Sequence, residues 1–149
     1  MQSLVVSTDF GNPARRCSGF NSNKLSIIIA MLEKRLGYAM GMTDIFLNVA
    51  GGLKVEDTAA DLAAVAAIMS AFTNTILPVG SVFIGEVGLL GELRNCAYAV
   101  PRIIEAQRLG FKKFFIPFAN FEKAKKELSD SDSILYGIKD VSELWQKIK

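Results

Sequence analysis

Apolar and polar positions along this chain follow two periods, which divide it into strands and helices. Short apolar runs bounded by turn residues predict strands, and apolar positions spaced three and four residues apart predict helices. The expected strands are residues 3–9, 43–52, 112–117 and 133–138, with two more inside 81–94. The expected helices are residues 23–37, 56–74, 98–110, 120–130 and 140–149. Helices and strands alternate in the second half, which predicts an α/β fold with parallel strand pairing.

Turn-forming and capping residues mark the breaks between these elements. Residues 10–23 are dense in Gly, Asn, Pro and Ser, so we expect a loop there. Asn21 or Ser22 is placed to cap the helix that follows, and Asp140 to cap the last helix.

The glycines of residues 81–94 predict a hairpin whose turn lies around Gly88 and Gly91. A hairpin adds antiparallel strands, so the expected fold class is α/β with a mixed sheet of the α+β kind. Neither an internal repeat nor a low-complexity linker divides the sequence. Residues 1–149 are therefore expected to form a single domain.

Composition narrows the class of protein. Of the 149 residues, 50% are hydrophobic and 21% are charged, with a net charge of +2. These values suit a domain with a sizeable core and exclude a disordered or polyelectrolyte chain. The first residues lack the pattern of a signal peptide, and no apolar stretch approaches 18 residues. We expect a soluble, cytoplasmic protein without membrane contact.

The chain has two cysteines and no histidine, which excludes several kinds of catalysis. Without an imidazole to act as base, Ser-His-Asp and Cys-His mechanisms are not available to a single chain. Cys17 and Cys96 lack the paired spacing of a zinc site, and a GxxxxGK[ST] phosphate loop is absent. We expect inert thiols and no cofactor in this domain.

Three acidic residues, Glu56, Asp57 and Asp61, lie at the start of the predicted helix 56–74. Carboxylates at this end of a helix complement its macrodipole. They are also possible ligands for a hard cation, although the helix start is the commoner explanation. The mechanism that needs no histidine is a Ser-Lys dyad, in which a lysine deprotonates a serine.

From residue 43 onward the chain resembles the proteolytic domain of the Lon proteases. The resemblance runs through "IGEVGLLGELR", a helix ending in "RLG", and "FKKFFIP". In that family a DGPSAG-type motif carries the nucleophilic serine, and a later helix supplies the lysine. Laid on "EDTAAD", the motif puts Ala59 at the serine position, and the lysine position falls on Arg102. Both dyad members are missing, because alanine has no nucleophilic oxygen and arginine stays protonated.

A second resemblance covers nearly the whole chain. The segments "FGNPARRCSGFNSNKLSIIIAMLEKR", "DIFLNVAGGLKVEDTAADLAA" and "RLGFKKFFIP" resemble the C-terminal Lon-like domain of the bacterial RadA (Sms) family of DNA repair proteins. This resemblance implies the fold shared with domain 2 of ribosomal protein S5, in a part excised from a longer protein. ATP and zinc belong to the N-terminal parts of that family, which this sequence does not contain.

The RadA resemblance also implies a role in homologous recombination. It implies a scaffold and DNA-binding domain, no longer a protease, of a DNA-dependent ATPase that drives branch migration. The implied partners are single-stranded or branched DNA, further copies of the chain in a hexameric ring, and a RecA-like ATPase core of the same chain.

Basic residues are the candidates for contact with DNA. Arg15 and Arg16 lie in a stretch of Gly, Ser and Asn that suits phosphate contact. The other candidates are Lys24, Lys54, Arg94 and Arg102. Each of these taken singly is also explained as a solvated surface cation. Arg102 has a rival role, an ion pair with Glu56, Asp57 or Asp61 across the lost active site.

Two other functions stay open at this point. One is a divergent Ser-Lys peptidase of the Lon family that uses a different serine, which cleavage of unfolded casein would reveal. The other is a protein-interaction module, with DNA held entirely by another part of a longer protein.

Overall fold

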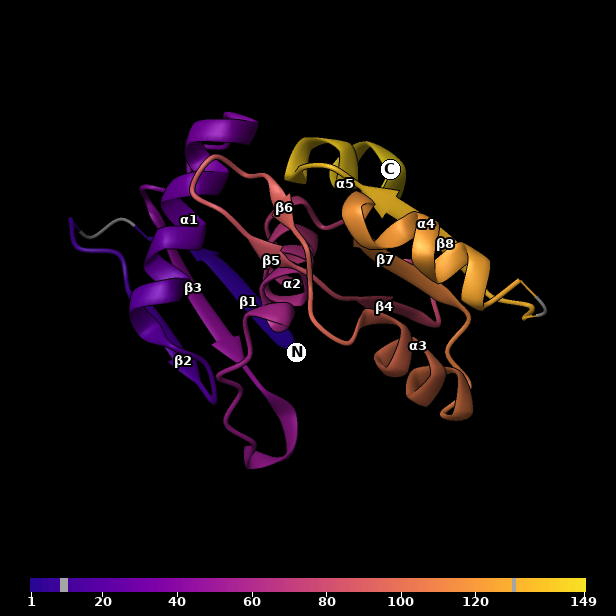
Figure 1. The fold of residues 1–149 in the computed structure, drawn as a ribbon. Helices are drawn as coiled ribbons and strands as arrows, with labels where there is room; N and C mark the ends of the chain where they lie inside the picture. Colours follow the sequence, from indigo (N-terminus) through magenta and orange to yellow (C-terminus); the bar gives the residue numbers. More distant parts are fainter. Residues whose placement is uncertain (9–10, 130) are drawn as a thin grey trace.

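The described part of the chain builds three small sheets and five α-helices, and the computed structural model describes residues 1–8, 11–129 and 131–149 (Figure 1). In chain order the elements are β1 (Gln2–Ser7), β2 (Arg15–Ser18), α1 (Ser22–Leu36), β3 (Thr43–Asn48), η1 (Ala50–Gly52), η2 (Thr58–Ala60), α2 (Asp61–Thr73), β4 (Ser81–Phe83), β5 (Glu86–Val87), β6 (Leu93–Arg94), α3 (Ala99–Arg108), β7 (Lys113–Pro117), α4 (Phe118–Glu127), β8 (Ile134–Ile138) and α5 (Val141–Ile148). Here η denotes a 3₁₀ turn. The expected α/β class with parallel and antiparallel pairing is confirmed.

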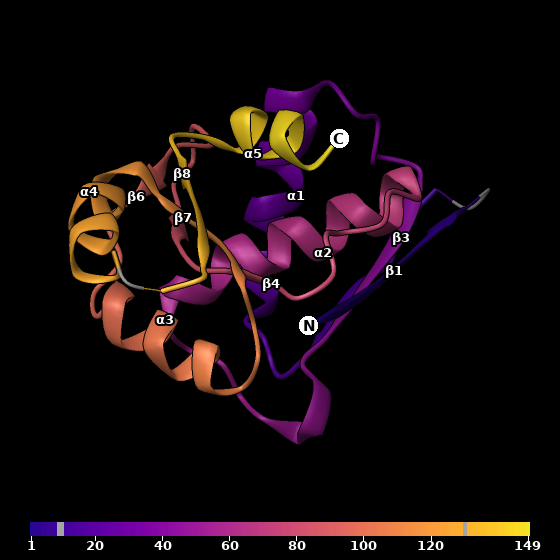
Figure 2. The same cartoon turned by 90° about the vertical axis from the view of Figure 1, so that its right-hand side faces the viewer.

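The first sheet has the strand order β1-β3-β2, with β1 antiparallel and β2 parallel to β3. Side chains alternate between its two faces, as they must in pleated strands. Ile45 and Leu47 are fully buried toward α1 and α2, which lie on this one side of the sheet (Figure 2). The opposite face keeps Leu4 58% exposed.

The second sheet, β4-β7-β8, is parallel throughout. Its middle strand β7 is buried on both faces, which explains its continuous apolar sequence. Phe115 belongs to the larger core shared with α1 and α2, whereas Phe114 belongs to a smaller core with α3 and α4. Phe115 also stacks between Phe83 and Tyr136 of the neighbouring strands, with ring centroids 4.7 and 4.5 Å apart.

The helix ends follow from side chains named by the sequence. Asn21 caps α1, since its side chain accepts a hydrogen bond from the backbone of Lys24, and Gly37 ends the helix with φ at 72°. Asp140 caps α5 in the same way through the backbone of Glu143. Both expected caps are confirmed.

The expected loop at residues 10–23 is wrong in its middle, where Arg15–Ser18 form β2. This short strand is parallel to β3, and Arg15 is opposite Ile45 in the register. The pairing is tertiary, so the surrounding Gly, Pro and Asn hid it. Phe10 of that loop, with Asp9 of the expected first strand and Asp130 of the expected fourth helix, lies outside the described residues.

The expected hairpin at residues 81–94 is also wrong in its extent. β4 leaves it and pairs in parallel with β7, which comes some thirty residues later in the chain. Only β5 and β6 form the antiparallel pair, closed by a hydrogen bond from Gly88 N–H to the carbonyl of Glu92 at 2.9 Å. The pairing of β4 is therefore determined by β7, which is distant in the sequence, and not by the adjacent turn.

Three further boundaries differ from expectation. The strand expected over 43–52 ends at Asn48, and the glycines that follow form η1. The helix expected from residue 56 begins as α2 at Asp61, after the 3₁₀ turn η2. Helix α4 begins at Phe118, directly after Pro117.

Candidate functional site

The start of α2, where a Lon-type motif would carry its serine, is held in place by backbone hydrogen bonds from both sides. Val55 N–H donates to the carbonyl of Gly19 at 2.8 Å. Gly85 N–H donates to the carbonyl of Ala59 at 2.8 Å, and Gly85 in turn accepts from Leu62 N–H. The turn η2 is therefore fixed between the first sheet and the β4–β5 segment.

Ala59 is 5% exposed and belongs to the smaller apolar core. Its neighbours in that core include Ile84, Cys96 and Val100. A side chain in this environment is shielded from solvent and from any substrate on the surface. Ala59 therefore differs from a nucleophile both in chemistry and in exposure.

Arg102 projects from α3 to the same turn. Its Nη2 donates to Oδ2 of Asp57 at 2.5 Å, and its Nε donates to the carbonyl of Ala97 at 3.2 Å. The expected ion pair across the site is thus found, with Asp57 as the partner among the three acidic residues.

Asp57 contacts both Ala59 and Arg102, the two expected dyad positions, through one carboxylate. Its Oδ1 accepts the backbone N–H of Ala59 at 2.9 Å, which caps the turn, while its Oδ2 accepts from Arg102. The hydrogen bond from Ala59 and the one from Arg102 both lower the pKa of Asp57 below its ordinary value. The carboxylate of Asp57 is therefore ionised at neutral pH, and both of its oxygens accept hydrogen bonds from within the chain.

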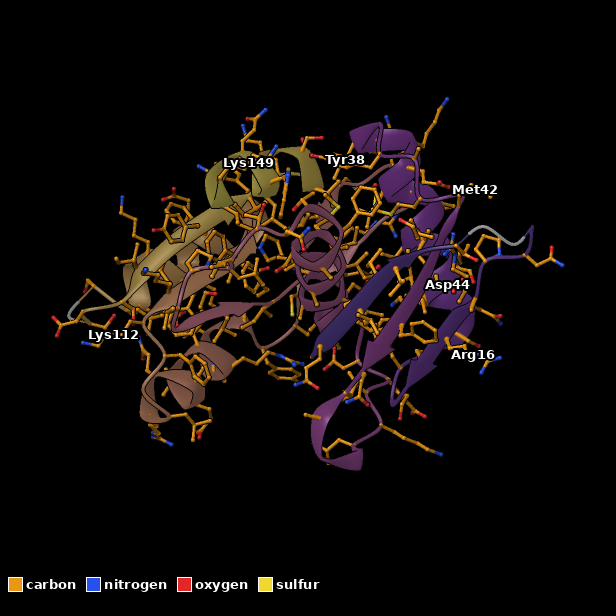
Figure 3. All side chains as sticks on the ribbon, turned by 180° about the vertical axis from the view of Figure 1, so that it is seen from behind. Arg16, Tyr38, Met42, Asp44, Lys112 and Lys149 are labelled. Carbon is orange, nitrogen blue, oxygen red and sulfur yellow. The ribbon has the colours of Figure 1, made fainter. Side chains whose placement is uncertain are left out.

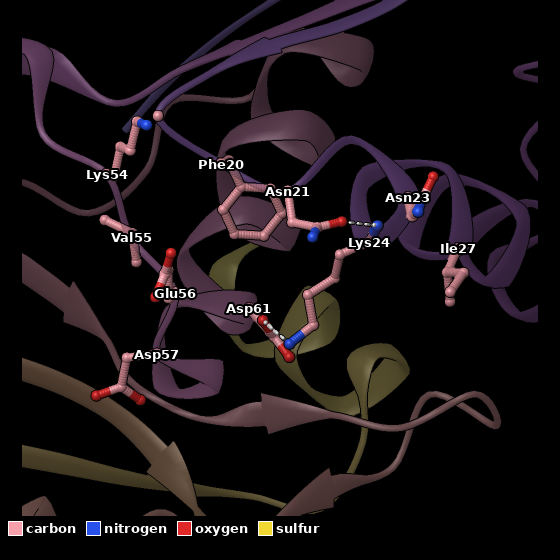
Figure 4. Close-up of a pocket in the computed structure, with 11 residues that line it drawn as sticks. Phe20, Asn21, Asn23, Lys24, Ile27, Lys54, Val55, Glu56, Asp57 and Asp61 are labelled. Atoms are coloured by element: carbon pink, nitrogen blue, oxygen red, sulfur yellow. Dashed lines mark hydrogen bonds and ion pairs between the residues drawn. The ribbon is translucent and has the colours of Figure 1, made fainter.

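Asp61, one turn further on, forms a second ion pair that the sequence did not reveal. It is 1% exposed, and its Oδ1 lies 2.9 Å from Nζ of Lys24 on α1 (Figure 4). Val87 N–H donates to its other oxygen at 3.3 Å. Burial raises the pKa of Asp61, and Lys24 opposes that rise. Lys24, a candidate for DNA contact, is thereby committed to an internal carboxylate.

A pocket of about 600 Å³ opens beside this ion pair, between the start of α1 and the segment before η2 (Figure 4). Phe20, Lys24 and Lys54 line it together with the three acidic residues Glu56, Asp57 and Asp61. Neither Ala59 nor Arg102 lines it. The pocket therefore reaches the dyad positions only through Asp57, and its surplus of carboxylates disfavours an anionic ligand.

Two more candidates for DNA contact are held by partners within the chain. The guanidinium of Arg15 donates to the carbonyls of Thr43 and Met40, the latter at 2.7 Å. Arg94 pairs with Glu92 at 2.8 Å and with Glu86 at 3.4 Å. The positive charges of Arg15 and Arg94 therefore have partners inside the chain and need no nucleic acid to balance them.

Arg16 and Lys54 remain the exposed candidates. Within the described part of the chain, the side chain of neither residue forms a hydrogen bond or ion pair. Arg16 follows Arg15 on β2, so the alternation of the strand turns it to the opposite, outer face. Figure 3 shows Arg16 pointing away from the body of the molecule.

The described acidic residues and the two cysteines do not form a metal site or a reactive thiol. Among the described residues, no three or more Cys, Asp or Glu side chains are grouped so as to hold a metal ion. Cys17 and Cys96 are free thiols, and burial raises the pKa of both, which leaves little thiolate at neutral pH. In the part of the chain that the structure describes, no helix is long and apolar enough to cross a bilayer.

The α/β architecture of the described residues is of the Lon-like class. The family model described as "Subunit ChlI of Mg-chelatase" matches residues 21–120, well over half of the chain, and the chain belongs to this family.

Relatives of the chain are DNA repair proteins named RadA, the family that its sequence motifs resemble. It is 39% identical over 143 residues to the DNA repair protein RadA of Chlamydia trachomatis, covering 96% of this chain and 31% of that protein. It is 44% identical over 122 residues to RadA of Bacillus subtilis, covering 82% and 27%. For RadA of Haemophilus influenzae the identity is 42% over 127 residues, covering 85% and 28%. The expected resemblance to the C-terminal domain of RadA is confirmed, and the chain spans under a third of these relatives' length.

Proposed function

We propose that this chain is a non-proteolytic scaffold domain that contacts DNA, within a repair protein of the RadA type. The observation that carries the proposal is the buried Ala59 beside the Asp57–Arg102 pair, combined with the similarity to RadA proteins over most of the chain. A domain with a Lon-like fold, but with alanine and an ion-paired arginine where the Ser-Lys dyad would lie, is suited to assembly and binding and not to proteolysis.

In a longer protein of this type, the domain would act beside a RecA-like core that uses ATP, in the cytoplasm. That core would drive branch migration in recombinational repair, and a hexameric ring would place the domain as a collar around DNA. Zinc and ATP would be held outside this domain. These roles extend the similarity to named repair proteins, whose own length is more than three times that of the matched region.

The proposal is tested by DNA binding and by mass in solution. Fluorescence anisotropy with labelled single-stranded and branched oligonucleotides, over a series of salt concentrations, should show binding that weakens as salt rises. Light scattering across protein concentration should show a closed oligomer. No binding at low salt, together with a monomer at all concentrations, would overturn the proposal. Cleavage of casein that persists through purification would favour the peptidase instead.

A second candidate function is a protein-interaction module without DNA contact. It is favoured by the finding that four of the six basic candidates have partners inside the chain. Those four are Arg15, Lys24, Arg94 and Arg102. Absence of DNA binding by this chain at low salt, with the oligomer retained, would support this candidate over the first.

A further inference from the structure

In the described part of the chain, no helix packs on the outer face of the first sheet (Figure 3). Both α1 and α2 lie on the inner side, and the view from behind shows β1, β3 and β2 without a described helix in front of them (Figures 2 and 3). The strand register sets two rows of side chains directly across this face. They are the row Leu4, Phe46, Arg16 and the row Gln2, Asn48, Ser18, which we call the open face.

The first row places an aromatic ring between an apolar and a cationic side chain. Phe46 is half-buried on the middle strand, with Leu4 on one side and the exposed Arg16 on the other. Neighbouring strands lie about 4.8 Å apart, so the guanidinium of Arg16 can contact a ligand that stacks on the ring of Phe46.

The second row supplies hydrogen-bonding groups beside the ring. Asn48 donates weakly to Gln2 at 3.5 Å, and both are exposed. Their amides present donors and acceptors, the groups that read the edges of bases. Ser18, also exposed, adds a hydroxyl at the end of the row.

A hollow of about 400 Å³ lies over these rows. Arg16 lines it, and no carboxylate does. This contrasts with the pocket near α2, whose lining carries three carboxylates and two lysines. Charge complementarity therefore favours an anionic ligand on the open face and disfavours one in the larger pocket.

We propose that the open face binds single-stranded DNA, with one base stacked on Phe46 and the adjacent phosphate on Arg16. The inference rests on the proposed function and names the form of DNA and the surface that holds it. Stacking needs the flat side of a base, which a duplex keeps covered by its neighbours, so a single strand is the form that fits. Asp44 lies two residues before Phe46 on β3. Its carboxylate repels phosphate, so the bound DNA strand is confined to the two rows.

The test compares Phe46→Ala and Arg16→Ala with matched controls on other surfaces. Phe118→Ala removes an exposed ring from α4, and Lys126→Ala removes an exposed cation from the same helix. The probe is a labelled 20-nucleotide dT strand, with a duplex of equal length for comparison. We expect about tenfold weaker binding of the dT strand for each open-face variant, and no change for the controls.

A further variant, Phe46→Trp, guards against loss of folding. It keeps a stacking ring, so we expect affinity for the dT strand within about threefold of the unsubstituted protein and quenching of the new fluorescence on binding. Unchanged dT binding in Phe46→Ala and Arg16→Ala would overturn the inference while leaving the proposed function standing. Absence of binding by the unsubstituted protein would overturn both.

The remaining outcome concerns a second copy of the chain as the occupant. If Phe46→Ala converts an oligomer to a monomer and leaves dT binding per chain unchanged, the open face is an interface between copies and the inference is wrong. Light scattering on the same samples gives this result.

Discussion

The side chains of Asp57 and Arg102 are joined by a hydrogen bond of 2.5 Å, and residue 102 is where the resemblance to Lon proteases would place the lysine of a Ser-Lys dyad. The same carboxylate caps the turn through the N–H of Ala59. The side chain of residue 59 lies in the smaller apolar core, so a serine introduced there would be shielded from substrate, and Arg102, which stays protonated, could not act as its base.

Ala59→Ser is therefore expected to be inactive against unfolded casein. The double variant Ala59→Ser/Arg102→Lys is expected to be inactive as well, because Asp57 would hold the new lysine in its protonated form. Release of fluorescent casein fragments is the measurement, with circular dichroism to show that each variant folds. Cleavage by the double variant above that of the unsubstituted protein would contradict this expectation.

Asp57→Ala is expected to cost more stability than Arg102→Ala. The first removes a cap worth about 1 kcal/mol together with an ion pair worth about 0.5 kcal/mol, whereas the second removes the half-exposed pair alone. Urea unfolding gives both values. Arg108→Ala is the control, because its pair with Glu105 is well exposed and near zero change is expected.

The pH dependence of the Asp57 effect has a definite sign. The folded-state pKa of Asp57 is lowered, so its contribution is complete above the ordinary value and is lost as the pH falls through the folded-state pKa. The difference between the unsubstituted protein and Asp57→Ala should therefore disappear in strong acid. A difference that stays constant below pH 3 would show that the carboxylate does not act through its charge.

Lys24→Met is expected to destabilise the fold by about 3 kcal/mol, because it leaves Asp61 buried without its cation. Adding Asp61→Asn removes the buried charge and should recover part of the loss. Lys54→Met, which removes an exposed lysine without an internal partner, is the matched control. Equal stability of Lys24→Met and Lys54→Met would contradict the importance of this pair.

The loss in Lys24→Met should also depend on pH. Burial already raises the folded-state pKa of Asp61, and removal of Lys24 raises it further. The penalty for the ionised form is absent below the unfolded pKa and grows as the pH rises through the folded-state value. Urea unfolding at pH 4 should therefore show a smaller deficit than at pH 7.

Gly137→Ala is expected to cost about 1 to 3 kcal/mol. A Cβ at Gly137 would lie 2.8 to 3.0 Å from the side chain of Phe121, so the packing of α4 on β8 must shift. Thermal unfolding measures the change. Gly11→Ala, where an added Cβ meets nothing within 4 Å, should leave the midpoint unchanged.

The sequence was sufficient wherever the cause of an element is local. The sequence itself shows the cap of α1 at Asn21 and its end at Gly37. It also shows β7 as an apolar run, which is typical of a strand buried on both faces. It was insufficient for β2 and β4, because β3 and β7 decide their pairing from far along the chain.

The site shows the same division between local and tertiary causes. A family motif identified Ala59 and Arg102 and led to the Asp57 pair. Nothing in the sequence joins Lys24 to Asp61, since that pair exists only once α1 packs near α2. Arg15 was expected in a loop and instead belongs to a strand, where pleating turns it inward to the backbone carbonyls that it holds.

Helix α2 packs against both of the larger sheets. The first sheet and the parallel sheet share no hydrogen-bonded strand pair in the described chain, yet α2 contacts both β1 and β4. Leu62, Val65 and Ile68 of this helix lie in the core that also holds residues of both sheets. If α2 unravelled, each sheet would expose its apolar face at the same moment. Melting of either half should therefore melt the other, in a single calorimetric transition.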